Sequence, residues 1–134
     1  MPLVRIDLTS GRTEAEIAAI GAAVRRALVE CLGVPARDRF QVITEHPPGR
    51  LVYDAAYLGV ARSDGIVLIH VFLSAGRTIE QKKAFYARAV DLLAGEAGVR
   101  RGDATIALTE NTREDWSFGD GLAQYLVLPK EQWK

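Results

Sequence analysis

An internal duplication constrains this chain more than any other feature of its sequence. When the sequence is compared with itself at a shift of 65 residues, the run 6–13 (IDLTSGRT) aligns with the run 71–78 (VFLSAGRT) without a gap. The alignment continues along the chain, where Asp38 matches Asp103. Matches that persist at one constant spacing indicate that the same supersecondary unit occurs twice.

Each unit has the pattern of a strand, a helix and a second strand. Apolar runs at 4–8 and 66–73 predict the first strand of each unit, and the second run is continuous enough to be buried on both faces. The second strands are expected at about 40–44 and 105–109. Two β-α-β units of this size predict one four-stranded mixed sheet with both helices on one face.

The two helices carry clear start and stop signals. Thr13 with Glu16, and Thr78 with Gln81, have the spacing of capping boxes, in which the two side chains satisfy free backbone N–H groups at a helix start. Glycines at positions 33 and 98 are expected to end the helices.

The predicted fold class is therefore α+β, with residues 1–134 forming a single domain. It divides into repeat units at about 2–46 and 67–111 and a C-terminal segment, 112–134. Helices on one face leave the other face of the sheet uncovered. An exposed apolar face of that kind favours oligomerisation.

Composition excludes several classes of partner. The chain has 17 Lys and Arg against 17 Asp and Glu, so it lacks the basic field that would hold a nucleic acid or an anionic membrane. No apolar run approaches the length of a membrane span and the start does not resemble a signal peptide, so a cytoplasmic location is expected. Cys31 is alone, and no Cys or His spacing predicts a metal site.

Pro2 is the first candidate for chemistry. If Met1 is removed, Pro2 becomes a secondary amine, which acts as a base or a nucleophile when neutral and polarises a carbonyl when protonated. The alternative is that Pro2 only begins a strand, where its missing N–H does no harm. The repeat favours the chemical interpretation, because the equivalent residue in the second unit is Val67, an ordinary strand residue.

Four segments then identify a family resemblance. Residues 2–8, 33–41, 77–82 and 111–119, the last containing Asp115-Trp116-Ser117-Phe118-Gly119, resemble malonate semialdehyde decarboxylases of the tautomerase superfamily. The resemblance extends from Pro2 to about Tyr125. It implies a duplicated β-α-β fold, a homotrimer and catalysis without a cofactor.

The resemblance also implies roles for particular residues. The catalytic proline falls on Pro2, the water-activating aspartate on Asp38 and the substrate-carboxylate arginine on Arg77. The apolar pocket wall falls on three further residues, Trp116, Phe118 and Tyr125. The repeat keeps a structural alternative open, since Arg12 and Asp103 occupy the positions equivalent to Arg77 and Asp38 in the other unit.

The loop before Arg77 departs from the family pattern. The decarboxylases carry two arginines flanking a proline, whereas this chain reads Ala75-Gly76-Arg77, with one extra residue and only the second arginine. The expected activity is decarboxylation of a small 3-oxo acid such as malonate semialdehyde, with hydration of unsaturated acids as a related activity. The alternatives are a cis-3-haloacrylate dehalogenase, a phenylpyruvate-type tautomerase, or a non-catalytic trimeric interaction module.

Overall fold

The two repeat units form one continuous sheet in the computed structural model of the chain, which describes residues 2–133. The first unit consists of β1 (Pro2–Thr9), α1 (Glu14–Leu32) and β2 (Phe40–His46). The second consists of β3 (Val67–Ser74), α2 (Ile79–Glu96) and β4 (Ala104–Asn111).

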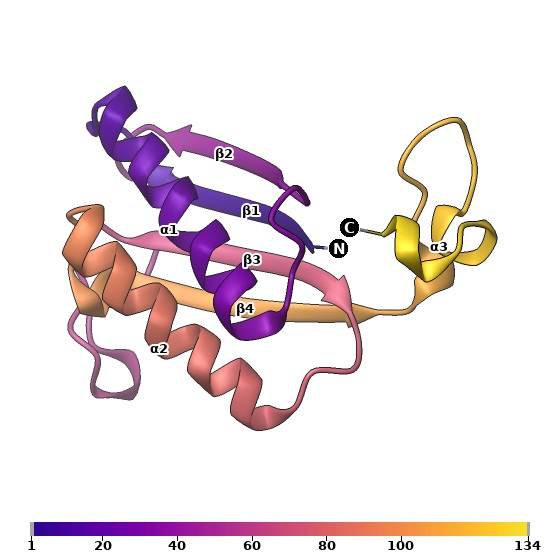
Figure 1. Cartoon of the computed structure of the whole chain (residues 1–134). Helices are drawn as coiled ribbons and strands as arrows, with labels where there is room; N and C mark the ends of the chain where they lie inside the picture. The colour runs from indigo at the N-terminus through magenta and orange to yellow at the C-terminus, as the bar shows by residue number, and fades with distance from the viewer. Residues whose placement is uncertain (1, 134) are drawn as a thin grey trace.

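Short helical turns lie in the connections and in the C-terminal segment. The turn η1 (Tyr57–Gly59) lies between β2 and β3, and η2 (Arg101–Asp103) precedes β4. After β4 come η3 (Arg113–Asp115), α3 (Gln124–Val127) and η4 (Lys130–Gln132). These C-terminal turns lie beyond the end of the sheet at which β1 begins, whereas the β2–β3 connection lies at the opposite end (Figure 1).

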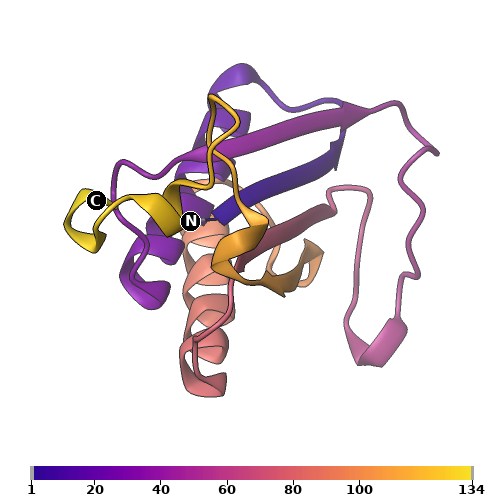
Figure 2. The same cartoon turned by 90° about the vertical axis from the view of Figure 1, so that its right-hand side faces the viewer.

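The sheet has the predicted mixed topology. Its strand order is β2-β1-β3-β4, with β1 and β3 antiparallel in the centre and each outer pair parallel. The hydrogen-bonding register also repeats, because Leu3 lies opposite Phe40 and Leu68 lies opposite Thr105. Both long helices cover the same face of this sheet (Figures 1 and 2).

The helix starts match the capping prediction fully in one unit and partly in the other. At α2, the Thr78 hydroxyl accepts from the Gln81 N–H, and the Gln81 side chain accepts from the Thr78 N–H. At α1, the Thr13 hydroxyl accepts from the Glu16 N–H but donates to the Glu16 carboxylate, so the reciprocal backbone bond of a capping box is missing.

The helix ends also differ between the units. Gly33 caps α1 in the left-handed conformation, with φ of 66°, as predicted. In the second unit, Ala97 caps α2, so the helix ends one residue before the position that would make Gly98 its cap. Gly98 nevertheless has the same φ of 66°, which only a residue without Cβ adopts freely.

Burial along β3 corrects one prediction. The run 66–73 was expected to be buried on both faces, but exposure alternates along β3: Val67, Ile69, Val71 and Leu73 are buried, and the residues between them are half-buried. The reason is that α1 and α2 cover only one face of the sheet, so every second residue points away from them.

The uncovered face is less apolar than the sequence pattern suggested. Leu3 and Phe72 lie on it side by side, but Arg5 and His70 form the next pair along the same two strands. Alternation along β1 places these polar residues on the outer face, since Val4 and Ile6 take the core positions. His70 contacts the Thr109 hydroxyl at 2.7 Å, a contact between neighbouring strands of the sheet.

No helix within residues 2–133 is both long enough and apolar enough to cross a membrane.

Candidate active site

Pro2 is the first residue of a central strand of the sheet. It lies opposite Leu73 in the antiparallel β1–β3 pair, and its side chain is buried on the face covered by the helices. The pairing of β1 with β2 begins one residue later, at Leu3, so Pro2 itself is paired only with β3. Met1 lies outside the described residues, so its removal stays an expectation.

Asp38 lies next to Pro2, in the turn between α1 and β2. The two residues line one small cavity of about 10 Å³ together with Leu28 and Phe40. Burial raises the pKa of Asp38 above the usual value for aspartate. The fold thus brings together two of the residues that the sequence analysis singled out.

A larger cavity of about 260 Å³ opens on the other side of Asp38. It is lined by Arg37, Asp38 and a set of residues from the C-terminal segment: Phe118, Gln124, Tyr125, Leu128, Gln132 and Trp133. Because Asp38 lines both cavities, it connects the start of β1 with the space enclosed by the C-terminal segment.

Arg77 lies between β3 and α2, at the same end of the sheet as Pro2. Its guanidinium donates to the backbone carbonyl of Leu32 at 3.2 Å and to that of Ser74 at 2.8 Å. These two bonds fix its orientation. Arg77 lines a third cavity, of about 290 Å³, whose wall includes Tyr125 and Trp133, the same two aromatic residues that line the cavity beside Asp38.

Aromatic side chains of the C-terminal segment pack in series over this end of the sheet. Phe118 contacts Tyr125 edge-on, with ring centroids 5.0 Å apart, and Tyr125 contacts Trp133 at 4.8 Å. Phe118 also lies 6.5 Å from Phe40 at the start of β2. Contacts of this kind stabilise an apolar wall that limits access of water.

Trp116 was expected in the apolar pocket wall, but it lies outside the cavity beside Asp38. Phe118 and Tyr125 line the cavity beside Asp38, but Trp116 is not part of its wall. Its ring stacks behind Phe118 at 5.6 Å, and its indole N–H donates to Asn111 Oδ1 at 2.7 Å. Trp116 therefore supports the wall from outside, because its N–H needs an acceptor that β4 supplies.

The pKa of the Tyr125 hydroxyl responds to charged residues on both sides of it. Burial raises the pKa of its hydroxyl, and the negative charge of Asp38 raises it further. Arg77 and Arg113 act in the opposite direction. Tyr125 therefore lies between Asp38, with which it lines one cavity, and the two arginines, with which it lines another.

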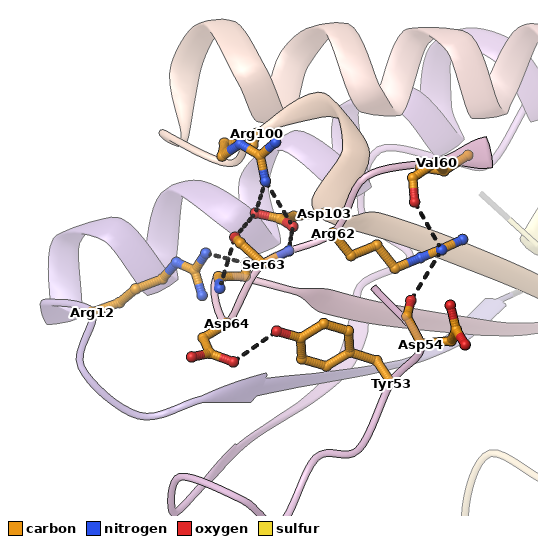
Figure 3. A network of polar contacts seen from close by, with 10 residues as sticks. Arg12, Tyr53, Asp54, Val60, Arg62, Ser63, Asp64, Arg100 and Asp103 are labelled. Atoms are coloured by element: carbon orange, nitrogen blue, oxygen red, sulfur yellow. Dashed lines mark hydrogen bonds and ion pairs between the residues drawn. The ribbon is translucent and has the colours of Figure 1, made fainter. Parts of the chain in front are cut away.

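At the other end of the sheet, the repeat places residues equivalent to the three candidates. Val67, Arg12 and Asp103 correspond to Pro2, Arg77 and Asp38, but here the β2–β3 connection fills the space between them (Figure 3). Asp103 accepts from the N–H and the hydroxyl of Ser63, both at 2.6 Å. Arg12 donates to the Gly65 carbonyl at 2.7 Å.

Gly65 shows how closely this second end is packed. A Cβ on Gly65 would lie 3.1 Å from the Asp103 carboxylate and 3.5 Å from the Arg12 guanidinium. Asp103 is only 1% exposed. The structural alternative therefore describes Arg12 and Asp103 well, whereas at the end that begins with Pro2 the equivalent Arg77 and Asp38 line open cavities.

Sequence reasoning missed two residues of the site, Arg113 and Trp133. Both line the cavity beside Arg77, and the Arg113 guanidinium lies 4.9 Å from the centre of the Trp133 ring. Both lie outside the repeat. Arg113 lies within the resembling segment 111–119, but the resemblance assigned it no role, and Trp133 lies beyond the resemblance. Within residues 2–133, no group of three His, Cys, Asp or Glu side chains could hold a metal ion.

Comparison with known proteins identifies the family. Two family models, both described as tautomerase enzyme, match residues 38–119 and residues 2–61. The probable tautomerase YusQ of Bacillus subtilis (strain 168) is 41% identical over 126 residues, which cover 94% of this chain and 99% of that protein. The chain belongs to the tautomerase superfamily of enzymes.

Solved structures place this tautomerase superfamily member near the malonate semialdehyde decarboxylases. FG41 malonate semialdehyde decarboxylase inhibited by 3-bromopropiolate is 51% identical, with a TM-score of 0.88, over 93% of this chain and 95% of that one. A second malonate semialdehyde decarboxylase, described by its decarboxylase and hydratase activities, is 40% identical with the same TM-score, over 93% and 96% of the two chains. The Q0 fused 4-OT symmetric trimer is 25% identical with a TM-score of 0.73, over 90% and 94%. These similarities confirm the resemblance and the duplicated fold expected from the sequence.

Proposed function

We propose that this enzyme decarboxylates a small 3-oxo acid, such as malonate semialdehyde, without a cofactor. The observation that supports the proposal lies at the end of the sheet where β1 begins, because Pro2, Asp38 and Arg77 line neighbouring cavities there. At the other end, Asp103, the repeat equivalent of Asp38, is buried and accepts hydrogen bonds from Ser63. Similarity at 51% identity to a malonate semialdehyde decarboxylase supports the choice of substrate class.

Pro2 supplies the electron sink once Met1 is removed. The neutral amine attacks the 3-carbonyl carbon, and loss of water gives an iminium ion. Cleavage of the bond to the carboxylate then releases carbon dioxide, and the electron pair moves onto the iminium nitrogen to give an enamine. Protonation at carbon and hydrolysis release the aldehyde and regenerate the amine. In the alternative route, protonated Pro2 donates a hydrogen bond to the carbonyl oxygen, and no covalent bond to the enzyme forms.

Asp38 and Arg77 act at the two ends of the substrate. Arg77 pairs with the carboxylate, since a guanidinium matches that group in shape and charge. Asp38, next to Pro2, influences the charge of the amine and activates water in the related hydration of unsaturated acids. The apolar wall formed by Phe118 and Tyr125 favours a step in which the charged carboxylate becomes neutral carbon dioxide.

A keto–enol tautomerase is the second candidate. It is favoured by similarity to two Bacillus subtilis proteins named probable tautomerases, YusQ at 41% identity and YrdN at 35%. The same amine would transfer a proton between carbon atoms, with no loss of carbon dioxide. Parallel assays with malonate semialdehyde, 3-haloacrylates and phenylenolpyruvate distinguish the decarboxylase, the dehalogenase and the tautomerase.

Pro2→Ala tests the proposed catalytic group. We expect kcat/KM for malonate semialdehyde to fall by roughly 10²-fold or more, the usual contribution of a positioned acid–base group. Intact-mass measurement first establishes that Met1 is absent. A form of the enzyme that retains Met1 is the matched control, because its Pro2 nitrogen is an amide, and we expect it to be inactive.

Borohydride trapping then separates the two routes. Reduction during turnover should leave a covalent adduct on the residue 2 nitrogen if the iminium forms, and no adduct if Pro2 acts only as a proton donor. Unchanged turnover by both the Pro2→Ala variant and the form that retains Met1 would contradict a catalytic role for Pro2.

A further inference from the structure

Arg113 faces the same cavity as Arg77, although the two residues come from different parts of the chain. Arg77 follows β3, and Arg113 begins the turn η3 after β4. Both line the cavity of about 290 Å³, together with Ser74, Ala75, Tyr125 and Trp133 among its wall residues. No carboxylate belongs to this wall. Among residues 2–133, the wall therefore carries two arginines and no acidic side chain.

The ion pairs of the described residues involve neither guanidinium. Among residues 2–133, no Asp or Glu forms an ion pair with Arg77 or Arg113. Both arginines lower the pKa of Tyr125, whose side chain forms part of the same wall. The side chain of Ser74, another wall residue, also has a buried Oγ without a hydrogen-bond partner among the described residues. Each of these groups is suited to an anionic ligand.

Trp133 holds the Arg113 guanidinium in place. The guanidinium carbon lies 4.9 Å from the centre of the indole ring, within the range of a cation–π contact. A contact of this kind restrains the Arg113 side chain where it lines the cavity. A lysine side chain has no planar guanidinium, so it would not present paired N–H donors in the same way.

We propose that Arg113 is a second ligand of the substrate carboxylate, opposite Arg77. This inference rests on the proposed decarboxylase function and adds a binding residue to it. Ala75, which lines the same cavity, brings no charge from the β3–α2 loop. Arg113, from the C-terminal segment, supplies the second positive charge that this loop lacks. The substrate carboxylate then lies between the two arginines, and its carbonyl points past Tyr125 toward Asp38 and Pro2.

The test combines steady-state kinetics with direct binding. Arg113→Gln is expected to raise KM for malonate semialdehyde by about 10- to 100-fold with little change in kcat, as loss of a charge-assisted contact made in both ground and transition states predicts. Arg113→Lys should recover part of this loss. Arg101→Gln is the matched control, because Arg101 pairs with Asp91 at 2.7 Å on the exposed side of α2, and it should leave KM unchanged.

Calorimetric titration with malonate measures the carboxylate subsite independently of turnover. Malonate should bind the wild type and the Arg101→Gln control, and bind Arg113→Gln about 10-fold or more weakly, while uncharged malonamide should not distinguish the variants. If the wild type binds malonate more tightly than Arg113→Gln does but shows no decarboxylase activity, the carboxylate subsite is supported and the proposed function is wrong. If a decarboxylating wild type and folded Arg113→Gln, verified by circular dichroism, share the same KM and malonate affinity, the inference about Arg113 is wrong.

Discussion

Among the individual residues of the site, Asp38 lies between two cavities. It lines the small cavity with Pro2 and also the larger cavity enclosed by aromatic side chains. Burial raises its pKa, so over the acidic range a smaller fraction of this carboxyl is ionised than of an exposed aspartate. Ionised Asp38 would stabilise a positive charge on Pro2 or remove a proton from water, whereas protonated Asp38 does neither.

Asp38→Asn should therefore change the pH dependence of the enzyme. In the wild type we expect kcat/KM to fall on the acidic side as Asp38 becomes protonated, with a midpoint above the ordinary pKa of 3.8. The variant should be less active near neutrality and should lack this acidic limb. Glu131→Gln, an exposed change in the C-terminal segment, provides a control for loss of one carboxylate. An identical acidic limb in Asp38→Asn would show that another group controls it.

Individual site residues differ in how far the sequence alone predicts them. Family motifs marked Pro2, Asp38 and Arg77, and the topology explains why they meet: the end of β3 lies beside the start of β1, because these strands are antiparallel. Arg113 and Trp133 could not be found in this way. Their positions depend on how irregular turns after β4 pack, and no periodic pattern encodes that packing.

At the element scale, the β2–β3 connection decides which end of the duplicated sheet stays open. Its backbone supplies a partner to Arg12, and Ser63 supplies two to Asp103. Arg100 also contacts the Asp103 carboxylate, at 3.3 and 3.4 Å. The loop thus satisfies, from within the chain, the groups that at the other end face open cavities.

Asp103→Asn should destabilise the fold more than the equivalent change at an exposed aspartate. An Asn side chain keeps only one acceptor oxygen, so one Ser63 donor loses its partner in a buried place, at a cost of about 1 to 3 kcal/mol. The free energy of unfolding in urea measures this cost at fixed protein concentration. Asp64→Asn, at an exposed residue whose remaining oxygen can still accept from the Tyr53 hydroxyl, should cost less. Equal costs would show that the buried network adds no stability.

The positions of the helices and strands were largely predictable from the sequence, but the burial of β3 was not. The repeat, the capping residues and the apolar runs located both helices and all four strands within a few residues. Apolar character along β3 did not reveal that one face stays uncovered in the single chain, since hydrophobicity alone does not say what will cover a strand. The alternating burial of β3 is a consequence of where α1 and α2 pack.

For the whole molecule, we propose that three chains associate through the face of the sheet that the helices leave uncovered. Apolar side chains remain on this face, including Val42 at 47% exposed, beside the polar residues Arg5 and His70. Similarity to the symmetric trimer of fused 4-OT supports the number. A mixed apolar and polar face is typical of a specific interface.

Light scattering at micromolar concentration should give a mass of three times the 14.6 kDa of one chain. Val42→Lys should shift the mass toward one chain, because it places a charge on the proposed interface. Val52→Lys is the matched control, since Val52 is 85% exposed in the β2–β3 connection, and it should remain trimeric. A wild type with the mass of a single chain would contradict the proposed assembly.

The placement of Pro2 and Trp133 has a practical consequence for handling the enzyme. Both ends of the described chain line cavities at the same end of the sheet, Pro2 beside Asp38 and Trp133 between the two larger cavities (Figure 1). If Pro2 is the catalytic amine, an affinity tag before it would convert that amine into an amide, and a tag after Trp133 would lie beside the proposed carboxylate subsite. A short tag inserted at exposed Val52, at the far end of the sheet, would leave both ends free for catalysis and for labelling.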